Sequence, residues 1–310
     1  MASSKLSIYA ALAANLLIAI TKFIAGAISN SAAMIAEGVH SVVDTVNELL
    51  LLLGLHRSKK QPDAMHPFGY GKELYFWSFI VSIMIFGLGG GVSIYQGITH
   101  IIHPEKMGDP TINYIVLSLS IVFEGTSLFI ALKQFNQVRG ATPWWEAVVK
   151  SKDPSSFLVL FEDAAAVAGL FIVIICVYLS HKLNLPYLDG VASLLVGIIL
   201  IIVSSILARE SRSLLMGEGV STQTREKICH MVEGDDHVVK VQHILSTYQS
   251  PSEVLLMLIV AFKDDLDTEE INIAIDRIRD KVKAEFKLVR FVIIQPESLD
   301  HHLLWNDDSH

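Results

Sequence analysis

An apolar stretch at residues 36–55, AEGVHSVVDTVNELLLLLGL, contains several ionisable side chains where a membrane-spanning helix would carry apolar ones. They are Glu37, His40, Asp44 and Glu48. Burying such a group in a bilayer costs at least a few kcal/mol, so it normally faces water, a partner or an ion. Positions i and i+4 of a helix lie only about 40° apart, so His40 and Asp44 share one face and can bind one ion.

The depth of this pair depends on where the helix begins. With Ser31 as the N-cap, His40 lies ~14 Å and Asp44 ~20 Å along the helix, which is near the middle of a bilayer. The alternative is that the polar stripe only joins two helices. We consider it the weaker reading, because polar contacts between membrane helices usually use Ser, Thr or Asn.

A second acidic group lies in a later apolar segment. Asp153-Pro154 is a helix-start pattern, and a further ten residues, ~15 Å, reach Glu162 and Asp163. Because this span is expected to enter the membrane from the opposite side, its acidic group lies at a similar depth. Carboxylates and an imidazole brought together without water need a cation, and these ligands suit Zn²⁺, Mn²⁺, Fe²⁺ or Co²⁺. Such ligands bind metal deprotonated, so metal release can be linked to proton uptake.

The composition identifies an integral membrane protein: 52% of the 310 residues are hydrophobic, 18% are charged and the mean hydropathy is +0.48. Six segments are long and apolar enough to span a bilayer, at residues 6–28, 32–55, 76–102, 112–135, 155–180 and 188–208. Lys and Arg are concentrated after the second, fourth and sixth segments, so a multi-pass protein with both termini cytoplasmic is expected. The net charge of −8 gives no indication of nucleic-acid binding, and two cysteines allow neither a disulfide framework nor a CxxC metal site.

The C-terminal part is soluble in character. Its pattern predicts the order αββαβ, an α+β domain with helices on one face of the sheet. We expect a transmembrane domain at 1–212 and this cytosolic domain at 213–310. About 90 residues bury only a modest core, so contact with a second copy is expected to stabilise it.

Several motifs together resemble the cation diffusion facilitator (cation efflux) family of metal–proton antiporters. They are Asn15 and Lys22 in NLLIAITKFIAG, the stretch SNSAAMIAEGVHSVVDTVNELLLLLGL, HPFGYGK before the third span, LDGVASLLVG in the sixth, and the soluble tail. HPFGYGK is the most specific of these. The resemblance implies a homodimer of six-span protomers, a zinc-type site between spans two and five, and a ferredoxin-like cytosolic domain.

Carried over by position, His40 and Asp44 match the family's pair in span two. Span five of the family usually reads HxxxD, and aligning its Asp with Asp163 places Val159 at the His position. Glu162 is the candidate to replace the missing His ligand. Glu162 and Asp163 are neighbours, however, so they lie about 100° apart on the helix and cannot both face one ion. We rank Asp163 above Glu162, and Glu162 above Glu124 of span four. The predicted metal ligands are His40, Asp44, Asp163 and Glu162.

Other family positions are altered. The loop site would use Asp63 and His66, but Tyr70 stands where the family has a third ligand, and tyrosine binds zinc poorly at neutral pH. We expect that site to be weakened or lost. In the soluble domain His243 falls at a position that the family uses for zinc, whereas Gln295 replaces a histidine, so regulation by cytosolic zinc is not expected.

Two further features have alternative readings. The terminal pair His301-His302 is either a metal contact or part of a solvated tail, and we favour the tail. Lys22 either snorkels to the membrane surface or pairs with Glu37.

The predicted function is export of a divalent cation, Zn²⁺ first, from the cytoplasm in exchange for protons, in the plasma (inner) membrane. The metal is cargo, and no cofactor or enzyme activity is expected. Manganese, iron or cobalt export by the same fold is the alternative. An intramembrane metalloenzyme, for which HExxH is absent, and a metal sensor without transport are less favoured.

Overall fold

A computed structural model describes residues 2–104, 109–140, 143–144, 147 and 152–298, with side chains described from Asn15 onward except Val138, Ser155 and Ser156. The chain divides into a helical unit, Met1–Gln61 with Lys72–Arg212, and a C-terminal unit, Pro62–Gly71 with Ser213–His310. Segment 62–71 therefore groups with the C-terminal residues. The domain limits expected from the sequence, 1–212 and 213–310, stay a prediction.

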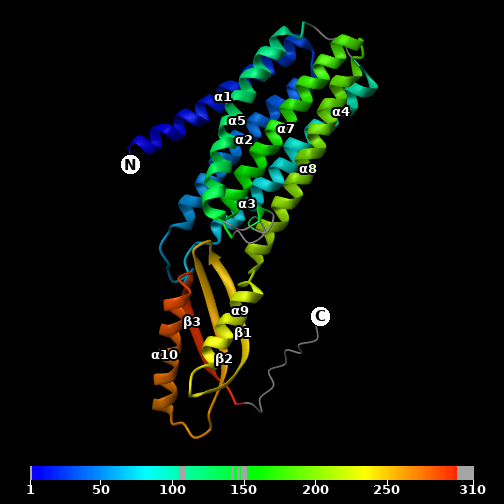
Figure 1. The fold of residues 1–310 in the computed structure, drawn as a ribbon. Coiled ribbons are helices and arrows are strands. Elements are labelled where there is room, and N and C mark those ends of the chain that lie inside the picture. Colours follow the sequence, from blue (N-terminus) through cyan, green and yellow to red (C-terminus); the bar gives the residue numbers. More distant parts are fainter. Residues whose placement is uncertain (1, 105–108, 141–142, 145–146, 148–151, 299–310) are drawn as a thin grey trace. The chain divides into compact units, whose positions relative to one another are not determined.

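The helical unit is a bundle of long helices (Figure 1). Its elements are α1 (Ala2–Ser29), α2 (Ala32–Ser58), α3 (Glu73–Met84), the π-helical η1 (Ile85–Gly91), α4 (Val92–Ile102), α5 (Thr111–Arg139), α7 (Pro154–Leu183) and α8 (Tyr187–Met216). Five stretches of the described residues are long and apolar enough to cross a membrane, namely Ala32–Ser58, Glu73–Ile102, Thr111–Gln137, Phe157–Leu183 and Tyr187–Met216. Asn15–Ser29 is apolar but shorter, so the first of the six spans stays a prediction.

The starts of α2 and α7 follow the local sequence. The Ser31 side chain accepts a hydrogen bond from the Met34 backbone N–H at 3.2 Å, which confirms Ser31 as the N-cap of α2. Pro154 is the first residue of α7, as the Asp153-Pro154 pattern predicted. With both starts as expected, His40 lies nine residues into α2, and Glu162 lies eight residues after Pro154 in α7.

Both η1 and α4 pack against α8 through glycine. A Cβ atom on Gly97 would lie 2.8 Å from the Gly190 carbonyl oxygen, and one on Gly197 would lie 2.9 Å from the Gly90 carbonyl oxygen. The missing side chains let the two backbones approach closely, as in other membrane helix pairs. The Ser193 hydroxyl also donates to the Ser93 carbonyl oxygen at 2.8 Å.

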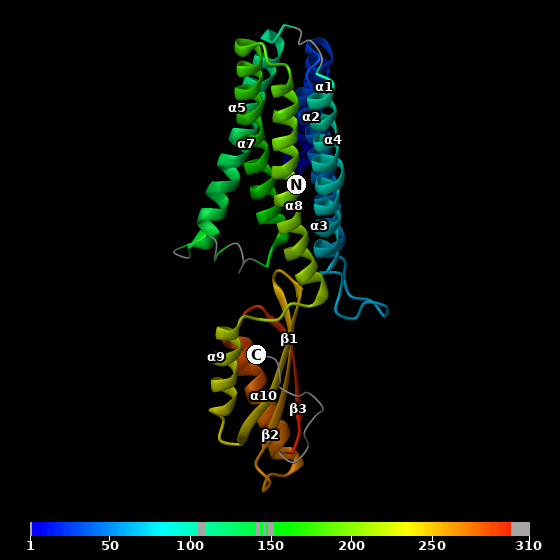
Figure 2. The same cartoon turned by 90° about the vertical axis from the view of Figure 1, so that its right-hand side faces the viewer.

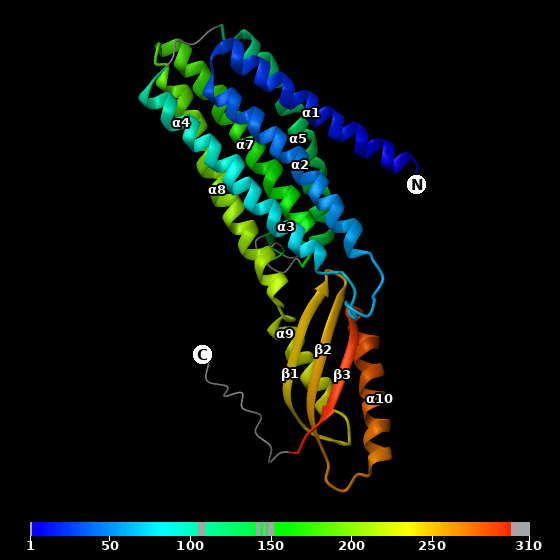
Figure 3. The same cartoon turned by 180° about the vertical axis from the view of Figure 1, so that it is seen from behind.

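The C-terminal unit is a three-stranded sheet with two helices. Its elements are α9 (Thr222–Glu233), β1 (Val238–Ser250), β2 (Glu253–Phe262), α10 (Thr268–Glu285) and β3 (Val289–Pro296). The strand order is β1-β2-β3, with β1 antiparallel and β3 parallel to β2. Figure 2 shows α9 and α10 on the same side of the sheet, and Figure 3 shows the sheet from its other face. The predicted αββαβ order and the fold class, a helical membrane domain followed by an α+β domain, are confirmed.

The core of this unit lies between the sheet and the helices. The central strand β2 buries Leu256, Leu258 and Val260, and α10 buries Ile278 and Val282, which lie four residues apart on one face of the helix. A capping box holds the start of α10: the Glu270 N–H donates to the Asp267 carboxylate, and the Asp267 N–H donates to that of Glu270.

Candidate metal site in the helical unit

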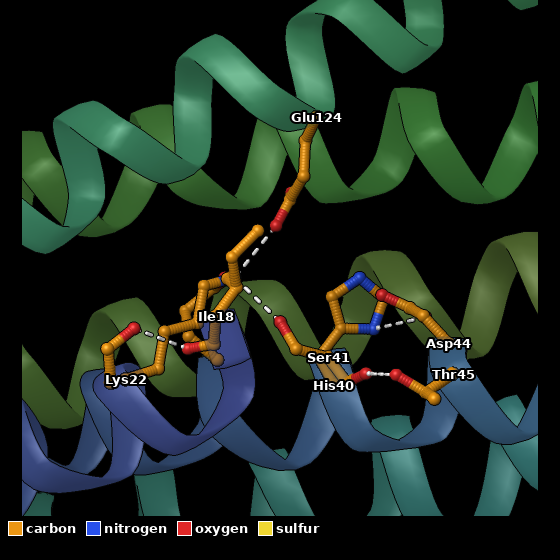
Figure 4. A network of polar contacts seen from close by, with 9 residues as sticks. Ile18, Lys22, His40, Ser41, Asp44, Thr45 and Glu124 are labelled. Carbon is orange, nitrogen blue, oxygen red and sulfur yellow. Dashed lines mark hydrogen bonds and ion pairs between the residues drawn. The ribbon is translucent and has the colours of Figure 1, made fainter. Parts of the chain in front are cut away.

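The predicted pair on α2 is formed as expected. His40 Nδ1 lies 3.3 Å from Asp44 Oδ1, one helical turn apart on the same face (Figure 4). The His40 side chain is 1% exposed and that of Asp44 is 21% exposed. The imidazole is therefore enclosed by the bundle, while the carboxylate is partly exposed.

Helix α7 contributes Glu162 to this pair. Glu162 is buried, its Oε1 accepts a hydrogen bond from Asn47 Nδ2 at 2.6 Å, and its carboxyl group interacts directly with that of Asp44. Two carboxyl groups in contact need a shared proton or a cation between them. His40, Asp44 and Glu162 are thus linked pairwise through Asp44.

Asn47 had not been identified from the sequence. It lies seven residues after His40, which places it on the same stripe of α2 two turns further along, and the stretch VNELL shows it beside Glu48. The heptad spacing was the signal that could have pointed to it.

Asp163 is directed elsewhere. Its Oδ2 accepts a hydrogen bond from the Ser127 hydroxyl of α5 at 2.7 Å, and it is not fully buried. Val159, at the family's His position and on the same face of α7 as Asp163, is 37% exposed. The structure therefore brings Glu162, and not Asp163, against Asp44. In the part of the chain that the structure describes, no three side chains of metal-ligating type are grouped closely enough to hold an ion.

Lys22 of α1 lies beside this site in a network of its own (Figure 4). It is 0% exposed, and its Nζ lies 3.1 Å from Glu37 Oε2, 2.9 Å from Ser41 Oγ and 2.8 Å from Glu124 Oε1. The contacts join α1 to α2 and to α5. The pairing with Glu37 is confirmed, and snorkelling is not adopted. Glu124, weighed as a further ligand, binds Lys22 through Oε1.

Several buried polar atoms around these residues make no hydrogen bond to other described residues. They are Glu37 Oε1, both ring nitrogens of His40, Asp44 Oδ1, Asn47 Oδ1 and Glu124 Oε2. A buried polar atom without a hydrogen bond costs about 1–3 kcal/mol, and buried groups in proteins are generally satisfied. Atoms of this kind concentrated in one place indicate that something polar is meant to lie among them.

The charges around the site are also unbalanced. The acidic side chains that influence one another here are Glu37, Asp44, Glu48, Glu124, Glu162 and Asp163. The cation that acts on them among the described residues is Lys22. Six ionised carboxylates and one ammonium would leave the group with a net charge of −5. Such a set needs protons or a metal cation to persist in a low-dielectric bundle.

The second site that the resemblance implied, in segment 62–71, is arranged as a closed loop. Tyr70 Oη donates to Asp63 Oδ2 at 2.7 Å, and the backbone N–H groups of Met65 and His66 donate to Asp63 Oδ1 at 3.0 and 2.8 Å. The hydrogen bond from Tyr70 is the main reason that the pKa of Asp63 lies below its usual range. Tyr70 thus occupies the carboxylate that a metal would use.

The C-terminal positions give a similar result. His243 on β1 and Gln295 on β3 both pair with Ile259 of β2, so they lie in one row across the sheet. The residue that replaces the family's histidine is therefore in register with the remaining one. His301 and His302 lie outside the described residues.

Comparisons with known proteins agree with this architecture. Residues 8–216 match the family "Cation efflux transmembrane domain". The "Proton-coupled zinc antiporter SLC30A9, mitochondrial" of Xenopus laevis is 31% identical over 286 residues, which cover 90% of this chain and 51% of that protein. The "Manganese efflux system protein MneP" of Bacillus subtilis is 25% identical over 290 residues, 92% of each chain.

Among solved structures, a MamM C-terminal domain in its nickel form matches 26% of this chain and 100% of its own, at 12% identity and a TM-score of 0.24. The chain spans about half the length of the Xenopus antiporter. The family match covers more than half of the chain, and it includes both α2 and α7. The protein therefore belongs to the cation efflux family, whose members are transporters and not enzymes.

Proposed function

We propose that this protein exports Zn²⁺ from the cytoplasm in exchange for protons, with the ion bound between α2 and α7. The observation that carries the proposal is the group of buried polar atoms without hydrogen bonds around His40 and Asp44. A divalent cation supplies what these atoms lack, since it accepts lone pairs from imidazole and carboxylate together.

The ligands that we propose are His40, Asp44 and Glu162, with Asp163 in a supporting position. This order reverses the ranking from the sequence, because Glu162 contacts Asp44 while Asp163 accepts a hydrogen bond from Ser127. Three protein ligands leave a fourth tetrahedral position for water. Because the three side chains are linked only pairwise through Asp44, binding of one ion by all three requires α7 to move closer to α2.

Proton exchange follows from the same residues. When the metal leaves, the contact between the Asp44 and Glu162 carboxyl groups is stable only with a proton between them. Metal and proton therefore compete for the same oxygens, which is the basis of exchange. Exposure of the site to one side of the membrane at a time then couples the two flows.

The test is flux in reconstituted vesicles that contain a zinc-sensitive and a pH-sensitive dye. We expect zinc-dependent proton movement in the wild-type protein and a loss of at least about a hundredfold in His40→Ala and in Asp44→Ala. His181→Ala, which removes a histidine near the end of α7, is the matched control and should transport normally. Zinc binding without flux would support a sensor and overturn the proposal.

Manganese is the second candidate cargo. A site with one imidazole and two carboxylates is harder than one rich in histidine, and the manganese efflux protein covers nearly the whole chain. A flux panel with Zn²⁺, Mn²⁺, Fe²⁺ and Co²⁺ at equal concentration decides between them. A preference for Mn²⁺ would replace zinc as the cargo and leave the site unchanged.

We also propose a homodimer, because the C-terminal domain is small and a second copy would stabilise it. Its termini are proposed to be cytoplasmic, because Lys and Arg are concentrated in the segments predicted to lie there, and the membrane is proposed to be the plasma (inner) membrane. The Xenopus relative is called mitochondrial, which supplies the alternative membrane. Fractionation of cells that express a tagged chain distinguishes the two locations. Light scattering of the detergent-solubilised protein gives the number of copies, and a monomer would exclude the dimer.

A further inference from the structure

Lys22 is among the largest fully buried side chains of the protein, yet the proposed metal shell does not use it. An ammonium group has three N–H donors, and Lys22 has three acceptors in reach: the carboxylates of Glu37 and Glu124 and the Ser41 hydroxyl. An ammonium in the middle of a membrane bundle is retained only with such partners. Its position in the network is therefore specified by side chains from two other helices.

The partner on α5, Glu124, lies close to the metal site as well. Its charge acts on Asp44, and one of its two oxygens, Oε2, is buried without a hydrogen bond. The other oxygen is held by Lys22 at 2.8 Å. Glu124 thus has one oxygen held by an internal cation and a second that makes no hydrogen bond to the described residues.

The partner on α2, Glu37, is placed differently. It is 0% exposed, and its free Oε1 lies against α7, where a Cβ atom on Gly169 would be 3.2 Å away. Lys22 therefore binds two carboxylates: Glu37, whose other oxygen faces α7 at Gly169, and Glu124, whose charge acts on Asp44.

We propose that Lys22 is a specificity-determining residue, an internal cation that keeps Glu124 out of the metal shell. With Glu124 withheld, the shell consists of His40, Asp44 and Glu162, a small set that suits the four-coordinate geometry of Zn²⁺. Release of Glu124 adds an oxygen ligand and favours harder ions that prefer more oxygen, such as Mn²⁺. This inference depends on the proposed function, because it assumes that the ion binds at His40 and Asp44.

A matched pair of charge-balanced double variants tests it. Lys22→Met with Glu37→Gln removes the ammonium and leaves Glu124 free, whereas Lys22→Met with Glu124→Gln removes the ammonium and leaves Glu37. Both remove one positive and one negative charge from the same network. The readouts are the ratio of Zn²⁺ to Mn²⁺ flux in vesicles and the ratio of their dissociation constants in detergent.

We expect the variant that leaves Glu124 free to lower the zinc-to-manganese ratio by about tenfold, and the variant that leaves Glu37 to stay within about threefold of wild type. Lys22→Arg, which keeps the cation, should also keep the ratio. Equal ratios in the two double variants, or a shift in the one that lacks Glu124, would overturn the inference.

If the double variants do not fold, a single variant still tests the inference. Glu124→Gln alone keeps the pairing of Lys22 with Glu37, and the inference requires it to keep the wild-type metal ratio. A changed ratio in that variant would make Glu124 a ligand and contradict the proposal. Failure of the proposed function is distinct, since the wild-type protein would then show no metal flux at all.

Discussion

Asp44 in the helical unit and Asp235 in the C-terminal unit are both sheltered carboxylates, but their surroundings differ. Asp235 has a 2% exposed side chain, and Arg277 donates to both of its oxygens, from Nε at 2.7 Å and from Nη2 at 2.5 Å. Asp44 faces an imidazole and another carboxyl group, and its Oδ1 makes no hydrogen bond to any residue that the structure describes. A fully paired carboxylate supports the fold, whereas an incompletely paired one is available to a ligand.

The largest effect that we expect concerns the two neighbouring acids of α7. Glu162→Gln should weaken zinc binding by at least about tenfold, because it removes a proposed ligand, and Asp163→Asn by about threefold or less. Titration of the detergent-solubilised protein with Zn²⁺ gives both constants. Each variant neutralises one carboxylate, so each is the control for the other, and the reverse order would restore Asp163 as the main ligand.

In the C-terminal unit we expect a loss of stability instead. Asp235→Asn should lower the local free energy of unfolding by about 2 kcal/mol, since it weakens hydrogen bonds to a charged partner. Hydrogen exchange of peptides from α9 and α10 in the full-length protein measures the change. Adding Arg277→Met to this variant should cost little more. Additive losses would show that the two residues do not act as a pair, and zinc flux should not change in either case.

The same pair predicts a dependence on pH. The hydrogen bond from Arg277 is the main reason that the pKa of Asp235 falls from 3.8 to about 2. Because the folded-state pKa is the lower one, its stabilisation is present above pH ~4 and is lost as the pH falls toward 2. We expect this loss to be about 1 kcal/mol after screening by solvent. Exchange protection of α10 measured between pH 5 and 2.5 should show it, and Asp235→Asn should abolish the difference.

At the metal site we expect the removal of a polar side chain to raise the stability of the protein. His40→Leu removes two buried nitrogens that make no hydrogen bond, so the metal-free protein should become more stable by about 1 kcal/mol, while zinc should no longer raise its melting temperature. Thermal unfolding followed by tryptophan fluorescence, with and without Zn²⁺, measures both. A marked loss of stability would mean that His40 has a structural role like that of Asp235.

The smallest effect concerns segment 62–71. Tyr70→His replaces the hydroxyl that occupies Asp63 with an imidazole beside His66, so one additional weak zinc site should appear. Isothermal titration compares it with Tyr70→Phe, which should release Asp63 without adding a ligand. Transport by both variants should stay within about twofold of wild type. If Tyr70→His binds no additional zinc ion, the loop geometry excludes a metal for a reason other than Tyr70.

Much of the fold followed from local patterns. At the start of α2 the Ser31 side chain accepts a hydrogen bond from a backbone N–H, and at the start of α7 Pro154 has no N–H that would need an acceptor. Both effects act within one helical turn. The αββαβ order followed from changes in hydrophobic periodicity. The close glycine contacts between α4 and α8 were not predicted, because they depend on which two helices meet.

The sequence by itself determined the pair His40 and Asp44, since residues four apart on one helix must share a face. The choice between Glu162 and Asp163 was decided only by the tertiary structure. Both residues lie at the same depth of α7, and the rotation of that helix against α2 and α5 selects which one faces Asp44. The partners of Lys22 were likewise decided by packing, because Glu124 is 102 residues away along the chain and reaches the ammonium only when α5 lies beside α1.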